Sequence, residues 1–250
     1  LHAEKFPERA KFVYASILNY IEAIRVITSA GGWVVRLGDS NMTPLPPMER
    51  VIDYPFTPFK SEWMDMYLFS ECRFFLGMPS GPYDLSRLFQ KRELMVNLSE
   101  WSTAFPLRKG DLCILKHIFS KSRNRYLSLK EILEEPLSEC QAALAPVGND
   151  YTIVENSPEE IRDVVEEFLG KPDEYKYSEL QEEFNFRRSL QIYQWLGEES
   201  TLTSTTLDVV EKYRYASHAD SVEGAVGQKY LEQNWLTDSF VENMPNQVTV

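Results

Sequence analysis

The sequence contains few cysteines and no paired cysteine motif. Its three cysteines, Cys72, Cys113 and Cys140, are odd in number and lie far apart in the 250-residue chain. Such a set does not form a disulfide scaffold, and without a C-x-x-C motif we expect no cysteine-based zinc site. Free thiols are typical of a reducing compartment, so we expect a cytoplasmic location.

Long apolar runs are absent as well. No run reaches the roughly 18 residues that a membrane-spanning helix needs, so the sequence predicts no membrane span. The first segment, LHAEKFPERAKF, is too charged for a signal peptide, and the first residue is leucine. We therefore expect the chain to begin inside a longer gene product.

Several familiar catalytic signatures are also missing. The sequence has no G-x-S-x-G, no H-E-x-x-H, no Walker A spacing and no G-x-G-x-x-G. These absences argue against an ordinary nucleotide hydrolase or a dinucleotide-dependent dehydrogenase, and no nucleophile signature is present.

Aromatic residues and charge characterise what the chain does contain. Aromatic residues make up 13% of it, which is too many for disorder over the whole length. The net charge is −12, but residues 1–135 carry 18 Lys and Arg against 16 Asp and Glu, whereas residues 136–250 carry 8 against 22. The acidic half makes duplex nucleic acid a poor partner, because phosphate contacts need a clustered basic face. The first half, which is nearly neutral, can hold a small anionic ligand. For the second half, the simpler interpretation is that its acidic helices only keep the protein soluble.

Short apolar segments alternate with helical segments in the first half. We expect helices at 9–29, 61–71 and 83–90, and strands at 33–37, 51–54, 73–76, 94–97 and 112–115. This alternation predicts an α/β fold, with a Rossmann-like parallel sheet and helices on both of its faces. We expect WVVRL, RFFLG and ELMVN to be neighbouring central strands.

After about residue 135 the pattern becomes mainly helical. Ser157, Pro158 and Glu160 have the spacing of a helix N-terminus: a serine cap, a proline in the first turn and a glutamate that completes a capping box. Two later helices are expected at 178–196 and 219–236. The resulting division is a Rossmann-like domain at 1–135 and an acidic, mostly helical C-terminal region at 136–250.

The strand, turn and helix between residues 73 and 90 contain a candidate phosphate site. Ser80 and Gly81 let a backbone approach a ligand closely, and Pro82 suits the first helical turn. The N-terminus of a helix that follows a parallel strand presents unpaired N–H groups and a partial positive charge, which favour phosphate. A plain tight turn between strand and helix explains the same residues.

A second candidate follows the strand WVVRL. Arg36 stands near the carboxyl end of that strand, where a guanidinium can clamp a diphosphate through two parallel hydrogen bonds. Gly38 would let the backbone pass close to a ligand, and Asp39 would orient Arg36 or accept a sugar hydroxyl. A solvent-facing arginine followed by a Gly-Asp turn is the alternative.

Single residues at other strand and helix ends complete the candidates. Lys60 and Asp65 flank the start of the second helix, where a surface lysine is the simpler explanation. Asn97 ends its strand and either reaches a base or ribose or serves a turn. His117 is one of three histidines and hence a candidate base, although a lone histidine is more often structural.

The segment CRFFLGMPSGPYDLSRLF resembles the donor-binding segment of GT-B glycosyltransferases, and it is most similar to that of heptosyltransferases. GGWVVRLGDSNMTPLP, VIDYPFTPFKSEWMD and CRFFLGMPSGP are similar to pieces of a group of bacterial glycosyltransferases found with surface-polysaccharide genes. Together these pieces cover roughly residues 15–135. The chain departs from the heptosyltransferase pattern at Pro79, where that family has an acidic residue that contacts the sugar.

The resemblance implies that the first domain is the donor-binding half of a GT-B fold. It implies transfer of a sugar from a nucleotide-diphosphate donor to a glycan or lipid-linked acceptor in polysaccharide synthesis. Lys60 would lie close to the donor phosphates. No D-x-D motif occurs, which agrees with the metal independence usual for GT-B enzymes, and no resident cofactor is implied. The competing interpretation is a non-catalytic Rossmann-like module that binds a partner.

Overall fold

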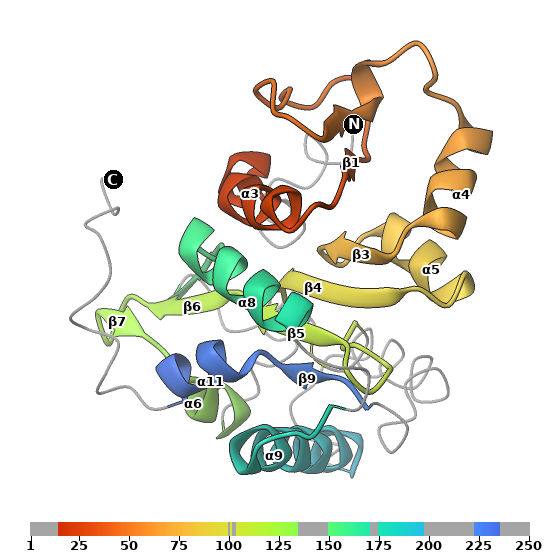
Figure 1. Ribbon diagram of the computed structural model, residues 1–250. Coiled ribbons are helices and arrows are strands. Elements are labelled where there is room, and N and C mark those ends of the chain that lie inside the picture. The colour runs from red at the N-terminus through yellow and green to blue at the C-terminus, as the bar shows by residue number, and fades with distance from the viewer. Residues whose placement is uncertain are drawn as a thin grey trace.

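A computed structural model describes residues 15–99, 101, 104–134, 150–170, 175–197 and 223–235 (Figure 1). Its strands are β1 (Val34–Arg36), β2 (Val51–Asp53), β3 (Phe74–Gly77), β4 (Arg92–Leu98), β5 (Leu112–Leu115), β6 (His117–Ser120), β7 (Arg125–Tyr126), β8 (Tyr151–Val154) and β9 (Ala225–Val226). Its helices are α3 (Ile21–Ser29), α4 (Glu62–Glu71), α5 (Gly81–Leu88), α6 (Leu129–Glu134), α8 (Pro158–Gly170), α9 (Glu179–Gly197) and α11 (Gln228–Asn234). The fold is therefore α/β.

The largest sheet is parallel and has the strand order β3-β4-β5-β9. β4 pairs in parallel with β3 on one side, Phe74 opposite Arg92, and with β5 on the other, Leu94 opposite Leu112. Nearly every residue of β4 is buried, as expected for a strand covered on both faces. The expected parallel sheet flanked by helices is confirmed, and so is the pairing of RFFLG with ELMVN.

The strand WVVRL does not join that sheet, which corrects our expectation of three central neighbours. β1 pairs in parallel with β2, and these two strands form a sheet of their own (Figure 1). Their register places Arg36 opposite Asp53. An apolar segment shows that a strand forms, but it does not show which strand lies beside it, and here the pairing separates Arg36 from β3.

Three strands after β5 form an antiparallel sheet that the sequence analysis missed. In the order β7-β6-β8, Phe119 of β6 faces Tyr126 of β7 and Thr152 of β8. The β6–β7 turn contains Asn124 in the left-handed region, with a φ of 49°. The strands are only two to four residues long, so their alternating pattern is too short to stand out from the sequence.

α8 covers the parallel sheet and packs against α3 (Figure 1). Its buried residues Ile161, Val164, Val165 and Phe168 follow helical spacing and face the core. The predicted N-terminus is confirmed: Glu160 N donates to Ser157 Oγ at 3.2 Å, and Ser157 N donates to Glu160 Oε2 at 2.8 Å.

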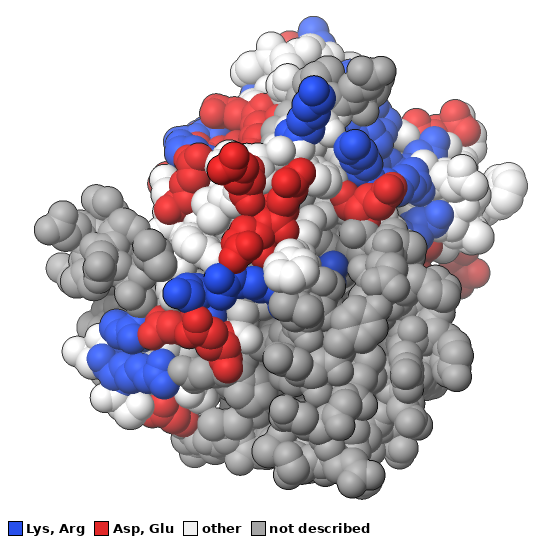
Figure 2. Space-filling view, turned by 90° about the horizontal axis from the view of Figure 1, so that it is seen from below, with Lys and Arg blue, Asp and Glu red and all other residues white. Residues whose placement is uncertain are grey.

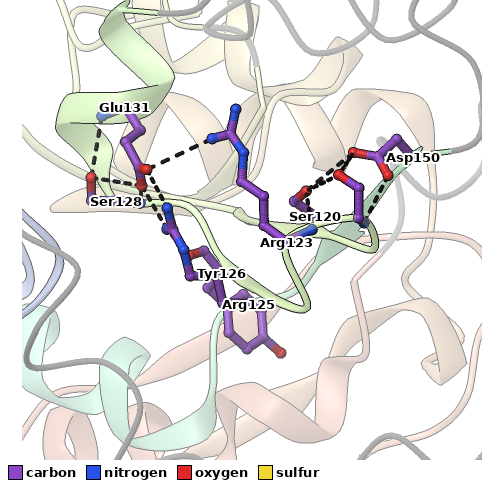
Figure 3. Close-up of polar contacts among 8 residues, drawn as sticks. Ser120, Arg123, Arg125, Tyr126, Ser128, Glu131 and Asp150 are labelled. Carbon is purple, nitrogen blue, oxygen red and sulfur yellow. Dashed lines mark hydrogen bonds and ion pairs between the residues drawn. The ribbon is translucent and has the colours of Figure 1, made fainter.

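Two further capping boxes of the same type begin α6 and α9. Glu131 N donates to Ser128 Oγ and Ser128 N donates to Glu131 Oε2; Ser178 and Gln181 repeat the arrangement. Figure 3 shows that Glu131 also accepts two hydrogen bonds from Arg125. Arg125 Nη1 donates to Glu131 Oε2 at 2.9 Å, and Arg125 Nη2 donates to Glu131 Oε1 at 2.5 Å. The hydrogen bond from Arg125, with help from Ser128, lowers the pKa of Glu131 to about 2. The glutamate of the α6 box therefore also ties the start of that helix to β7.

The parallel sheet takes strands from both sides of residue 135. β9 pairs with β5, with Ala225 opposite Leu112, and α8 lies in the same hydrophobic core as β4 and β5. The division at residue 135 itself stays a prediction.

The predicted helix at 219–236 is shorter in the part of it that the structure describes, because β9 and then α11 occupy residues 225–234. The rest of that prediction lies outside the described residues, and so do residues 9–14 of the first predicted helix.

Two further observations concern the surface. None of the described helices is both long and apolar enough to cross a membrane. Among the residues coloured in Figure 2, Asp and Glu side chains gather in a group that is bordered by separate groups of Lys and Arg side chains.

Candidate functional site

Arg36 and its neighbours at the carboxyl ends of β1 and β2 form the first candidate site. Arg36 is only 7% exposed, which argues against the alternative of a solvent-facing arginine. Its Nη1 donates to Thr43 O at 2.7 Å and lies 3.2 Å from Asp53 Oδ1. Asp53 Oδ2 in turn accepts from Leu45 N at 2.8 Å. The Arg36–Asp53 pair thus fixes the proline-rich loop between the two strands.

The other terminal nitrogen of Arg36 is not satisfied in this way. Nη2 is buried and has no hydrogen-bond partner within the described part of the chain, and Asp53 Oδ1 likewise accepts no hydrogen bond there. Leaving a buried donor unpaired costs about 1–3 kcal/mol, more for a charged group. Such an atom calls for an explanation, and an anionic ligand that supplies an acceptor would provide one.

Gly38 lies directly beside this unpaired nitrogen. Its φ is +145°, and a Cβ added there would be 2.5 Å from Met42 Sδ and 3.7 Å from Arg36 Nη2. The thioether of Met42 and the guanidinium therefore both approach the Gly38 backbone. Met42 is exposed and unbranched, so its side chain can move aside at little cost. The close approach at Gly38 is made by Met42 in this structure, and an approach of the Gly38 backbone to a ligand stays a prediction.

Lys60 belongs to the same region. Its Nζ bonds to Asp65 and lies 5.3 Å from the ring centre of Tyr54. The hydrogen bond to Asp65, with the negative charges of Asp65 and Asp39, raises the pKa of Lys60. A ligand phosphate would have to compete with Asp65 for the ammonium group.

Asp39 does not contact Arg36 in any observed ion pair; the carboxylate that does so is Asp53, which the sequence analysis missed. Asp53 is the last residue of β2 and lies opposite Arg36, the last residue of β1. The sequence places both at strand ends but does not give the register. The signal in the sequence that could have predicted this pair is that two neighbouring strands end in residues of opposite charge, Arg36 and Asp53.

Ser80, Gly81 and Pro82 lie where the sequence placed them, between β3 and α5. Ser80 occupies the cap position without a side-chain cap bond, and its Oγ donates to Met78 O at 3.3 Å. A Cβ at Gly81 would meet nothing within 4 Å, so this turn borders open space. The turn follows a different sheet from Arg36, and no hydrogen bond or ion pair observed among the described residues joins the two. A single site shared by Arg36 and Ser80 stays a prediction.

Asn97 lies in a third environment, fully buried at the end of β4. Asn97 N donates to Asn156 Oδ1 and Asn156 N donates to Asn97 Oδ1, both at 2.7 Å. Asn97 Nδ2 donates to Tyr20 Oη at 3.4 Å, and burial raises the pKa of Tyr20 to about 12. The left-handed backbone of Asn97, with a φ of 55°, is tolerated well by asparagine. These contacts give Asn97 a structural role.

His117 is buried beside the first turn of α8. Its Nε2 lies 2.8 Å from Glu160 Oε1, and its ring packs at 5.7 Å from the rings of Tyr126 and Tyr230. Burial alone would raise the pKa of Glu160, but the charge and hydrogen bond of His117 hold that pKa below its usual value. A general base must reach its substrate, so this buried arrangement fits a structural histidine.

The described residues contain no group of three or more histidine, cysteine, aspartate or glutamate side chains arranged to hold a metal ion. Comparisons with protein-family models, curated proteins and solved structures found no match to the chain.

Proposed function

We propose that the chain binds a nucleotide-diphosphate sugar and acts as a glycosyltransferase, or as the donor-binding half of one, with a GT-B arrangement. The acceptor would be a glycan or a lipid-linked sugar. One observation carries the proposal: the buried guanidinium of Arg36 keeps Nη2 unpaired beside Gly38, at the carboxyl end of a parallel strand. Ligands of open α/β sheets bind at that end of the strands.

The charges around Arg36 suit the leaving group of such a reaction. When the sugar departs, negative charge grows on the diphosphate, and a preorganised donor aimed at it lowers the barrier. Because Thr43 O and Asp53 hold the Arg36 guanidinium in place, it needs little reorganisation as this charge develops. Lys60, which lies over the ring of Tyr54 just after β2, supplies a second positive charge. The residues of the chain that we assign to this role bind and orient the diphosphate; we assign no base.

The experiment is a thermal-shift screen of the chain with nucleotide sugars. A ligand present at 100 times its dissociation constant stabilises the fold by about 2.7 kcal/mol, so a true donor should raise the melting temperature measurably. In Arg36→Lys the shift should largely disappear, because an ammonium cannot replace the guanidinium fork.

Arg50→Lys is the matched control. Arg50 also donates to a backbone oxygen, Gly31 O at 2.8 Å, but it is more exposed and borders the opposite end of β2. It should keep the full shift. The proposal fails if no nucleotide sugar stabilises the wild-type chain, or if Arg36→Lys responds as strongly as Arg50→Lys.

A second candidate function is a non-catalytic interaction module, and the surface of α4 favours it. Trp63 is 79% exposed and Tyr67 52%, and the two are one helical turn apart; Phe59, just before the helix, is 71% exposed. Exposed aromatic residues on one helix face are typical of a partner-binding surface. If this surface is the functional one, Trp63→Ser should abolish partner binding while nucleotide sugars give no thermal shift.

A further inference from the structure

A phenylalanine that the sequence analysis did not single out lies against the candidate phosphate site. Phe56 ends a short 3-10 helix, Tyr54–Phe56, which follows β2 directly. The centre of its ring is 5.5 Å from the guanidinium carbon of Arg36, within the range of a cation–π contact. Phe56 is nevertheless 43% exposed. Its ring therefore covers the guanidinium and still leaves much of its surface to solvent.

The backbone around Phe56 is held on both sides. Tyr54 is buried, and its hydroxyl accepts from Ser61 N at 2.9 Å and donates to Ser61 O at 3.1 Å. Thr57 Oγ1 donates to Tyr54 O at 2.8 Å, and Thr57 N donates to the same oxygen. These bonds close the turn that carries Phe56. A rigid exposed ring loses little entropy when a flat ligand stacks on it, which makes it an effective contact surface.

We infer that Phe56 stacks against the base of the nucleotide donor while Arg36 Nη2 receives its diphosphate. In a nucleotide only a ribose separates the base from the phosphates, so a stacking ring and a phosphate-binding group must be close neighbours. Phe56 and Arg36 are in contact, and the buried, unpaired Nη2 is the independent sign of a ligand at this place. This inference rests on the proposed function. It assigns a binding residue to the base of the donor, for which the phosphate contacts do not account.

The test compares ligands with and without a base. The intact chain is titrated calorimetrically with inorganic pyrophosphate and with the 5′-diphosphates of uridine, adenosine and guanosine. Stacking of one base on an aromatic side chain is worth about 1–3 kcal/mol, which is roughly a 5- to 150-fold change in affinity. At least one nucleoside diphosphate should bind tighter than pyrophosphate by about this factor.

Phe56→Ala should then weaken the best nucleoside diphosphate by roughly 5- to 150-fold and leave pyrophosphate affinity unchanged. Phe56→Tyr, which keeps an aromatic face, should retain the affinity. Phe59→Ala is the matched control, because Phe59 is an exposed phenylalanine of the same segment with no contact to the Arg36 guanidinium among those observed. It should change neither affinity. The melting temperature of each variant, measured without ligand, reports whether its fold is intact.

The possible failures are distinguishable. If pyrophosphate and the nucleoside diphosphates bind equally, or if Phe56→Ala binds the nucleoside diphosphate as well as the wild type does, the base does not stack on Phe56 and this inference is overturned, while the phosphate site stands. If the wild-type chain binds none of these ligands, the proposed function fails and the inference fails with it. If Phe59→Ala weakens binding as much as Phe56→Ala, the stacking residue is misassigned.

Discussion

Two groups of polar residues lie at the ends of parallel strands, and they differ in how completely they are satisfied. At the end of β4, Asn97 and Asn156 use both the oxygen and the nitrogen of their side-chain amides, and the group is buried. At the ends of β1 and β2, Arg36 and Asp53 pair with each other, yet each keeps a buried atom without a hydrogen bond. The first arrangement is complete without a ligand, whereas the second gains from one.

The surroundings of the two groups differ in the same direction. Burial raises the pKa of Tyr230 well above its usual value, and Tyr230 Oη donates to Leu115 O at 2.6 Å, close to the Asn97–Asn156 pair. Around Arg36, by contrast, Met42 and Phe56 are exposed. Buried, fully bonded networks mainly specify a unique core. Incomplete networks with exposed aromatic neighbours are where we expect binding, and mutations in the two groups should therefore have different consequences.

The largest effect should come from Asn156→Ala. The change leaves Asn97 N without its acceptor, removes a donor from Leu115 O and opens a cavity, so we expect a loss of about 2–4 kcal/mol. Urea denaturation measures it. Asn19→Ala, which removes a partly buried bond to Glu155 and a long one of 3.5 Å to Asn156 O, is the control and should cost about 1 kcal/mol or less. Equal losses in the two variants would show that the group at β4 is not the more important one.

A smaller, pH-dependent effect is expected at Glu160. Its pKa is lower in the folded than in the unfolded state, so its contribution to stability is present above the usual carboxyl pKa near 4.5 and is lost as the pH falls below that value. Glu160→Gln keeps the capping geometry but loses the charge beside His117, and should cost about 1 kcal/mol at neutral pH.

The measurement for Glu160 is the free energy of unfolding between pH 3 and pH 7. The difference between wild type and Glu160→Gln should shrink toward zero at the acidic end. Glu159→Gln, in the same helical turn but exposed, should track the wild type throughout. A difference that stays constant with pH would mean that the carboxylate charge of Glu160 is not what stabilises the junction with His117.

The smallest effect on stability should be at the exposed face of α4. Trp63→Ser removes a side chain that is 79% exposed, so unfolding free energy should change by less than about 0.5 kcal/mol. Thermal or urea unfolding suffices to check this. A loss above about 1 kcal/mol would show that Trp63 packs against other parts of the chain, and it would remove the reason for treating this face as a binding surface.

Local signals in the sequence were the reliable ones. Ser157 was expected as a helix cap and accepts the bond that the cap requires, and Ser61 caps α4 in the same way. The same S-x-x-E/Q signature at Ser128 and Ser178 was present and went unused. Capping is decided within a few residues, so a short motif is enough to predict it.

Pairing over long distances could not be predicted. The contact between Arg36 and Asp53 depends on the register of β1 and β2, and the role of Asn97 depends on Asn156, 59 residues later. Both are tertiary facts that no local pattern contains. For that reason, the sequence could suggest residue types for the site but not the partners that surround them.

The pairing of β9 with β5 also has a consequence for the order of events during synthesis. Ala225 lies opposite Leu112, so the ribosome must add more than one hundred residues before β5 gains its second neighbour. Until then the nascent chain presents an apolar strand edge, Leu112–Leu115, that can pair with the wrong partner. A chain that is cut short before residue 225 keeps that edge open, and we expect it to accumulate in aggregates even though most of its helices and strands have already been made.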